Sequence, residues 1–337
     1  MNESQAMQRA LQLAARGRGW AEPNPLVGCV LLRGGAVIGE GHHERFGDAH
    51  AEVNALADAR SRGHDPAGAT AVVTLEPCSH TGKTGPCANA LIDAKVGRVV
   101  AAMTDPDPRV SGRGFDRLRA AGIAVQVGVE EAAARALNAP FIKRLTTGLP
   151  FVTLKWAQTL DGATATSTGH SQWISGPASR RRVHELRAVS DVVMVGSGTF
   201  LADAPRLTAR DVEVRRVAKR VVVSAGDRIP RDAPIFSDSA GPVEVMAGPL
   251  EDGLRRLASE GATHVLVEGG ATLNGALLNA GLVDRVLVFL APSLCGDPAG
   301  HPAAVLGPCA TMNDVKTLRL RNVERLGDDV MLDYAVG

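Results

Sequence analysis

The sequence predicts an α/β fold with two domains, each built around its own sheet. Short apolar runs of strand length alternate with helical patterns along the whole chain, as they do in α/β proteins. The length of 337 residues suits roughly two or three domains of about 100–200 residues each. After the segment TTGLP at 146–150, the pattern restarts with an apolar strand. We therefore expect one domain at residues 1–147 and a second at residues 148–337.

The first domain begins with an amphipathic helix in residues 1–20, which lack the continuous apolar stretch of a signal peptide. The apolar runs 26–33 and 36–41 flank Gly34-Gly35 and predict a β-hairpin. The elements expected next are a helix at 50–62, a strand at 69–75, a helix at 86–94, a strand at 97–103, a helix at 114–121 and a strand at 123–129.

The second domain is expected to contain a helix at 177–190, with its N-cap at Ser175, and another from Ala271. Two strand-to-glycine turns, VGSGTF at 195–200 and VEGGATLNG at 267–275, lead into predicted helices and could admit a phosphate. Neither turn is a G-x-G-x-x-G fingerprint, so no Rossmann fold is predicted. The expected strands are 151–157, 191–196, 219–225, 242–248, 263–270, 284–292 and 328–336.

Composition excludes several classes of function. A net charge of +1 offers no electrostatic basis for binding nucleic acid or an anionic membrane. Three Trp, one Tyr and seven Phe are too few for a platform on which single strands stack, and no apolar run has the length of a membrane span. The five cysteines are too scattered for a disulfide framework. Cysteines that remain thiols are typical of proteins in the reducing cytoplasm. Three of them are expected to be buried small hydrophobes: Cys29, Cys295 and Cys309.

A predicted metal site carries the main functional signal. His50 and Cys87 stand at the starts of predicted helices, and Cys78 follows a predicted strand. Zinc prefers nitrogen and thiolate ligands, and three protein ligands leave a fourth position for water. Glu52 is close enough in sequence to His50 to take a proton from that water.

The order H-x-E, P-C and a second cysteine is the signature of zinc nucleobase deaminases. Those enzymes have two residues between the cysteines, whereas eight separate Cys78 from Cys87. The alternative is a non-catalytic zinc site, or buried cysteines beside a capping histidine. In the loop between the cysteines, Lys83 among glycines and threonines suits a phosphate.

Four motifs together make the resemblance specific. NPLVGCV, HHERFGDAHAE, EPCSHTGKTGPC and DPDPRVSGRG resemble the deaminase half of the bifunctional riboflavin-biosynthesis deaminase/reductase family, and the eight-residue gap matches it. The resemblance extends from about Met7 to the end of the chain. It implies an N-terminal cytidine-deaminase-like α/β/α domain followed by an α/β domain similar to dihydrofolate reductase.

For the first domain, the resemblance implies zinc on His50, Cys78 and Cys87, with Glu52 as proton shuttle. The substrate contacts that it implies are Asn24, His43 and Lys83, with Asp105 and Asp107 in addition. The family's usual PNP motif is PDP here, so Asp107 stands where the family has asparagine.

For the second domain, the resemblance implies two sets of contacts. Those to NADPH are Ala157, Trp173, Thr199, Asp203, Ser224, Gly270, Ala271, Thr272, Leu273, Asn274, Gly275 and Ala276. Those to the phosphorylated sugar substrate are Ser171, Arg187, Leu207, Arg210 and Glu268. Ala204 replaces an aspartate that many relatives have.

The implied function has two steps. Hydrolytic deamination of 2,5-diamino-6-ribosylamino-4(3H)-pyrimidinone 5′-phosphate would be followed by NADPH-dependent reduction of the ribosyl group. We expect a cytoplasmic homo-oligomer acting on a small molecule. One alternative is a deaminase of another base whose second domain serves assembly. The other is a zinc-stabilised RNA-binding module, which a steep loss of RNA affinity with salt would reveal.

Overall fold

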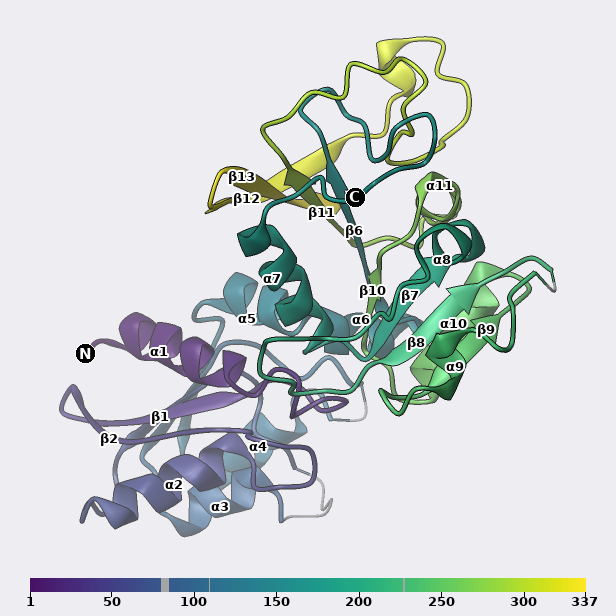
Figure 1. Ribbon diagram of the computed structural model, residues 1–337. Helices are drawn as coiled ribbons and strands as arrows, with labels where there is room; N and C mark the ends of the chain where they lie inside the picture. Colours follow the sequence, from purple (N-terminus) through teal and green to yellow (C-terminus); the bar gives the residue numbers. More distant parts are fainter. Residues whose placement is uncertain (80–84, 109, 227) are drawn as a thin grey trace. The chain divides into compact units, whose positions relative to one another are not determined.

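The computed structural model describes residues 1–79, 85–108, 110–226 and 228–337 (Figure 1). These residues divide into two compact units, Met1–Gly148 and Leu149–Gly337. Each unit has its own sheet with helices on both faces, so both are α/β structures.

The first unit has a mixed sheet with the strand order β2-β1-β3-β4-β5. Its strands are β1 Gly28–Arg33, β2 Ala36–His42, β3 Thr70–Val73, β4 Arg98–Ala101 and β5 Ala124–Val127. The predicted hairpin is β1 and β2, which pair antiparallel through a turn where Gly34 and Gly35 have φ of 56° and 79°. β1 is also antiparallel to β3, while β3, β4 and β5 run parallel. Parallel β3 and β4 therefore end at the same edge of the sheet.

Helices cover both faces of this sheet (Figure 1). They are α1 Glu3–Ala15, α2 Ala51–Ser61, α3 Cys87–Asp93, α4 Arg113–Ala120, α5 Glu131–Leu137 and α6 Ala139–Thr147. Successive strand residues point to opposite faces, so Val73 and Val99 pack against α2, α3 and α4. Val72 and Val100 pack against α1 and α5 on the other side. This is the α/β/α arrangement expected for the first domain.

The second unit has the strand order β12-β13-β11-β6-β10-β7-β8-β9. Its strands are β6 Phe151–Gln158, β7 Val192–Gly196, β8 Lys219–Val223, β9 Val243–Met246, β10 His264–Val267, β11 Arg285–Leu290, β12 Leu318–Leu326 and β13 Asp329–Val336. All pairings from β11 to β9 are parallel, and β13 and β12 add an antiparallel hairpin at one edge. The carboxyl ends of β6, β10, β7 and β8 therefore share one edge.

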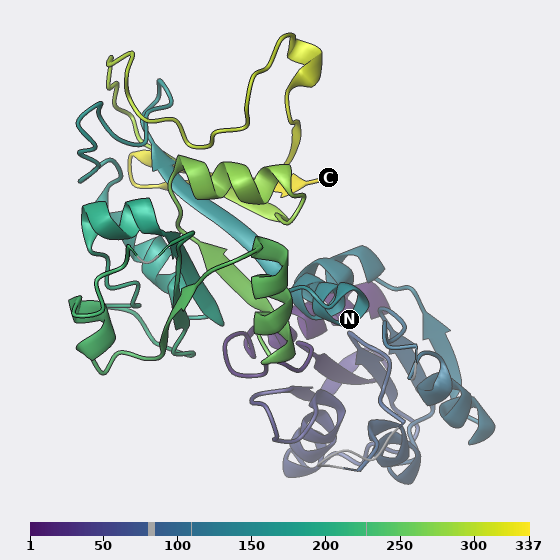
Figure 2. The ribbon, with the colours of Figure 1, turned by 90° about the vertical axis from the view of Figure 1, so that its right-hand side faces the viewer.

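Helices again cover both faces (Figure 2). They are α7 Pro177–Arg187, α8 Ser197–Asp203, α9 Pro234–Ser237, α10 Leu250–Ser259 and α11 Ala271–Asn279, with a 3₁₀ turn at Met312–Asp314. Met194 and Val221 face α10 and α11. Val195 and Val222 face α8 and α9, while α7 packs on Phe289 through Val183.

Several local predictions need correction. Helix α7 has its N-cap at Gly176 rather than Ser175. Cys29 is buried as expected, but Cys309 is exposed and Cys295 is partly exposed, because both lie in the long connection between β11 and β12. Within the described ranges, no helix combines the length and the apolar character needed to cross a membrane.

Candidate functional site

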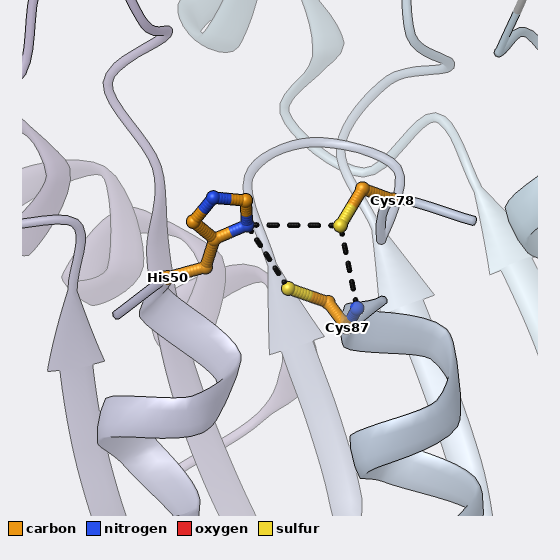
Figure 3. A group of neighbouring side chains, drawn as sticks. All are labelled: His50, Cys78 and Cys87. Carbon is orange, nitrogen blue, oxygen red and sulfur yellow. Dashed lines mark hydrogen bonds between the residues drawn. The ribbon is translucent and has the colours of Figure 1, made fainter. Parts of the chain in front are cut away.

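Three metal-ligating side chains converge in the first unit (Figure 3). His50 is the N-cap of α2, Cys78 lies in the segment after β3, and Cys87 is the first residue of α3. His50 Nδ1 lies 3.2 Å from Cys87 Sγ and 3.6 Å from Cys78 Sγ. All ligand atoms of the group lie within 4.8 Å of one another.

The start of α3 stabilises a thiolate at this point. Pro86 is the N-cap of α3, so the backbone N–H of Cys87 points out of the helix and donates to Cys78 Sγ at 3.3 Å. Hydrogen bonds from Cys87 and from His50 lower the pKa of Cys78 to about 4, despite its partial burial. The same contact with Cys78, together with burial, raises the pKa of Cys87. The hydrogen bonds to Cys78 thus favour its thiolate form.

The donor set fits a zinc ion. One imidazole nitrogen and two sulfurs are ligands that zinc prefers, and bond lengths of about 2.0–2.3 Å imply ligand atoms about 3.3–3.8 Å apart in a tetrahedral site. The nitrogen–sulfur distances of 3.2 and 3.6 Å are close to that range. Zinc binds cysteine as the thiolate, so metal binding would be coupled to the loss of protons from these ligands.

Glu52 lies in the first turn of α2 and is only 3% exposed. Burial, followed by the negative charge of Cys78, raises the pKa of Glu52 to about 7. A carboxyl group with a pKa near neutrality can both accept and donate a proton at physiological pH. Glu52 therefore has the properties of a general acid–base group beside the metal-ligating residues.

Two predicted substrate contacts also lie close to this group. His43 is buried, and its ring lies 5.2 Å from that of His50. The two ring nitrogens of His43 contact the carbonyl oxygen of Ala49 and the side-chain amide of Asn24, both at 3.1 Å. Burial lowers the pKa of His43, so the ring is neutral and orients the Asn24 amide.

Of the remaining predicted substrate contacts in the first unit, Asp105 and Asp107 lie within the described residues and Lys83 does not. Asp105 and Asp107 form a turn after β4, in which Asp105 Oδ1 accepts from the N–H of Asp107 at 2.8 Å.

An ionic cluster lies in the second unit near the carboxyl ends of β6 and β10. Arg187 makes a bidentate pair with Glu268, with N–O distances of 2.5 and 2.9 Å. Lys155 Nζ lies 3.5 Å from the same carboxylate, a partner that sequence reasoning missed. Burial alone would raise the pKa of Glu268, but Arg187 and Lys155 hold it at about 2. Burial also lowers the pKa of Lys155.

The loop between β6 and α7 brings Ser171 and Trp173 to a cavity of about 200 Å³. Trp173 is 70% exposed, and the Arg180 guanidinium lies 4.8 Å from its ring centre. Burial raises the pKa of Asp203, at the end of α8, and the neighbouring Ser171 side chain partly opposes this shift. A large exposed aromatic ring beside a cavity can stack on a planar ligand.

The expected cofactor residues lie on adjacent elements at this edge of the sheet. Ala157 is on β6, Thr199 on α8, Ser224 directly after β8, and Gly270 is the N-cap of α11. A Cβ added to Gly270 would lie 3.0 Å from Thr199 Oγ1, so the two glycine turns approach each other closely. Helix starts at the carboxyl ends of parallel strands suit the phosphates of a dinucleotide. These residues thus fit NADPH.

The seven-residue segment at the start of α11 is not uniformly accessible. Ala271, Thr272 and Ala276 are at least partly exposed, whereas Leu273, Asn274 and Gly275 are buried. The Asn274 amide donates to the carbonyl of Ala303 at 2.8 Å, which fixes the loop after β11. Contacts to a cofactor would therefore come from the beginning of this segment.

Gly275 allows α11 and the loop that carries Val305 to pack closely, and a larger residue at this position would disturb that packing. A Cβ at this position would lie 1.9 Å from the carbonyl oxygen of Val305, so we expect Gly275→Ala to destabilise the second unit by about 1–3 kcal/mol. Urea unfolding of the full chain measures this. Gly198→Ala is the control, because a Cβ there meets nothing within 4 Å. Equal stability of the two variants would contradict the expectation.

The two remaining substrate contacts lie after α8. Leu207 is buried with a φ of 55°, and Arg210 is exposed with one bond to the Thr208 hydroxyl. Arg187 also donates to the Thr208 carbonyl at 3.1 Å. The Arg187 guanidinium is thus already paired within the chain, while Arg210 projects a cation into solvent.

Family comparisons agree with both sites. Residues 1–103 match the cytidine and deoxycytidylate deaminase zinc-binding region, and residues 150–332 match the RibD C-terminal domain. The chain is 39% identical to the Escherichia coli riboflavin biosynthesis protein RibD, covering 98% of this chain and 99% of that protein. The chain belongs to the RibD family. It is also 41% identical to RibD of Mycobacterium tuberculosis, covering 97% and 96% of the two chains.

Solved RibD structures share the full architecture. Acinetobacter baumannii RibD aligns with a TM-score of 0.90 at 37% identity, covering 99% of both chains. A diaminohydroxyphosphoribosylaminopyrimidine deaminase/5-amino-6-(5-phosphoribosylamino)uracil reductase from Thermotoga maritima aligns with the same score at 35% identity and the same coverage. As a member of this family, the chain is a bifunctional enzyme of riboflavin biosynthesis with a zinc-binding deaminase domain and an NADPH-using reductase domain. The predicted fold class, activities and cofactors are thereby confirmed.

Proposed function

We propose that residues 1–147 deaminate 2,5-diamino-6-ribosylamino-4(3H)-pyrimidinone 5′-phosphate, and that residues 148–337 reduce the product to 5-amino-6-ribitylaminouracil 5′-phosphate. The observation that carries the first step is the convergence of His50, Cys78 and Cys87 beside a buried carboxyl group with a raised pKa. The names of the Thermotoga relative's two activities support this substrate and this order.

In the deamination, His50, Cys78 and Cys87 hold the zinc. Zinc bound there would lower the pKa of water and so supply a nucleophile for the ring carbon that bears the 2-amino group. Glu52 takes a proton from the attacking water and passes it to the amino group, which leaves as ammonia. The Asn24 amide, oriented by His43, holds the pyrimidine edge.

Two further groups complete the proposed deaminase contacts. Asp105 and Asp107 contact the substrate from the turn after β4, at the sheet edge where the segment carrying Cys78 also begins. Lys83 binds the phosphate by virtue of its charge.

Losing a sulfur ligand tests the metal assignment. We expect Cys78→Ser to lose bound zinc and ammonia release together, because a serine hydroxyl is a poor zinc ligand at neutral pH. Zinc content is measured on the purified full chain by elemental analysis. NADPH oxidation with the deaminated product is the control, and it should persist because the three proposed ligands, His50, Cys78 and Cys87, all lie in the first unit. Full zinc content in Cys78→Ser would contradict the assignment.

In the reduction, NADPH bound to the second unit would supply a hydride to C1′ of the ribosyl group. The bond between C1′ and the ring oxygen would break and that oxygen would take a proton from solvent, which leaves an open ribityl chain. Trp173, Thr199, Ser224 and the start of α11 hold the cofactor, with Ala157 and Asp203 beside it. Arg210 and Ser171 bind the phosphorylated sugar, and Leu207 shapes the pocket. Arg187 and Glu268 act as a pair that holds the sugar at the ends of β6 and β10.

We further propose a cytoplasmic homo-oligomer. None of the five cysteines forms a disulfide, which supports a reducing compartment. Leu320 and Val323 are more than half exposed on β12, at one edge of the second sheet, and such side chains favour association between copies. Light scattering of the purified chain would measure its mass, and a monomer would contradict the oligomer.

A further inference from the structure

Glu76 is a buried carboxylate that the proposed chemistry does not use. It precedes Cys78 by two residues and is only 3% exposed. Its oxygens accept three backbone N–H groups, all from the segment that follows β4. The bonds are Oε2 to Asp105 N at 3.1 Å, Oε2 to Gly112 N at 3.0 Å and Oε1 to Gly114 N at 2.9 Å.

Two of these bonds lie at the start of α4. Gly112 is its N-cap and Gly114 is in its first turn, where backbone N–H groups have no partner within the helix. A carboxylate at this end satisfies those donors and interacts favourably with the helix dipole. Glu76 therefore anchors α4 to the segment that carries Cys78.

The same helix contacts that segment at two more points. A Cβ at Gly114 would lie 2.0 Å from the carbonyl oxygen of Pro77, so the two backbones are in direct contact. Arg117 Nη1 donates to the carbonyl of Ser79 at 3.2 Å and to Asn89 of α3 at 3.1 Å. Contacts at Glu76, Pro77 and Ser79 thus hold the chain on both sides of Cys78.

The third bond reaches the turn of Asp105 and Asp107. One carboxylate therefore joins a segment with a zinc ligand to a turn with proposed substrate contacts. We propose that Glu76 is a positioning residue for deamination, which sets the distance between the metal-ligating group and the substrate-binding turn. This inference rests on the proposed function. Glu76 touches neither the substrate nor the reacting atoms, and acts through Asp105.

Glutamine is the sharpest replacement because it keeps the shape of the side chain. Its amide has one oxygen, so its NH₂ group must face at least one of the three N–H donors. The turn or the start of α4 then moves away to find water. Since small displacements of positioned groups have large kinetic effects, we expect KM for the diaminopyrimidinone phosphate to rise roughly tenfold or more.

The experiment measures ammonia release, zinc content and NADPH oxidation on full-length Glu76→Gln. The expected result is a raised KM with a smaller change in kcat, unchanged zinc and unchanged reduction of the deaminated product. The matched control is Glu40→Gln, which removes a carboxylate paired with Arg9 in the same unit and should leave KM unchanged. If Glu76→Gln fails to fold, Glu76→Asp, which keeps the charge but shortens the reach, should give the same rise in KM.

An unchanged KM in the folded variant would overturn the proposal. Loss of zinc from the variant would overturn it too, because the role of Glu76 would then be to hold the segment that carries Cys78, and not to position the substrate-binding turn. Wild-type protein that releases no ammonia from this substrate would instead refute the proposed function.

Discussion

Replacing Glu52 by glutamine should reduce ammonia release by roughly 10²–10⁴-fold, the usual contribution of a positioned general acid–base group. The amide has nearly the same shape but cannot accept and return a proton. Zinc content should stay unchanged, because His50, Cys78 and Cys87 are all retained. Steady-state ammonia release and elemental analysis on the same preparation measure both quantities.

Two controls separate a chemical effect from a structural one. Glu40→Gln changes a carboxylate of the same unit and should release ammonia at the wild-type rate. NADPH oxidation with the deaminated product should be normal in Glu52→Gln. Ammonia release close to the wild-type rate in Glu52→Gln would refute the proton-transfer role.

Glu268→Gln should destabilise the second unit by about 3 kcal/mol, because it leaves the charges of Arg187 and Lys155 buried without a counter-ion. Hydrogen exchange followed by mass spectrometry on the full chain can report the two units separately. Faster exchange is expected in β6 and β10, with no change in β1 and β3. Glu251→Gln is the control, since it removes an exposed helical pair worth only a few tenths of a kcal/mol.

The same carboxylate gives the second unit a pH dependence of known sign. The pKa of Glu268 is lowered from 4.5 to about 2, so its contribution to stability is complete above about pH 4.5. It is lost as the pH falls from about 4.5 towards 2. Wild-type stability should decline over that window, and Glu268→Gln should lack this part of the decline. If the stability of the two proteins fell equally over this pH range, the stabilising role of the Glu268 carboxylate would be refuted.

The proposed zinc ligands could be predicted from sequence because each one stands at a local structural signal. His50 directly precedes a helix whose apolar residues recur at helical spacing. Cys87 follows a proline at the start of a second helix, and Cys78 follows a buried strand. Helix–strand–helix order then brings the three to one edge of a sheet.

Partners distant in sequence could not be predicted in this way. The bonds of Glu76 span 29 to 38 residues, and the pair of Lys155 with Glu268 joins separate strands. A lysine within the apolar strand FVTLKWA was the available signal, since a charge there needs a partner when buried.

Several of the elements that sequence reasoning missed lack a clear apolar pattern. Strand β12 has the sequence LRLRNVERL and is mostly exposed along its length, so it looks like a charged loop. Helices α5 and α6 are short neighbours, and α6 has no buried residue. Helix α9 spans a single turn, whereas α10 was missed despite its buried Leu254 and Leu257. A glycine in its middle, Gly253, weakens the helical signal there.

The most direct test of the two-step account is one coupled assay on purified full-length protein with the diaminopyrimidinone ribosylamino phosphate. Ammonia release is followed without NADPH, and NADPH oxidation is followed after the cofactor is added. The account predicts ammonia first, then oxidation that depends on the deaminated product. NADPH oxidation with no preceding ammonia release, or neither signal from protein that contains zinc, would contradict it.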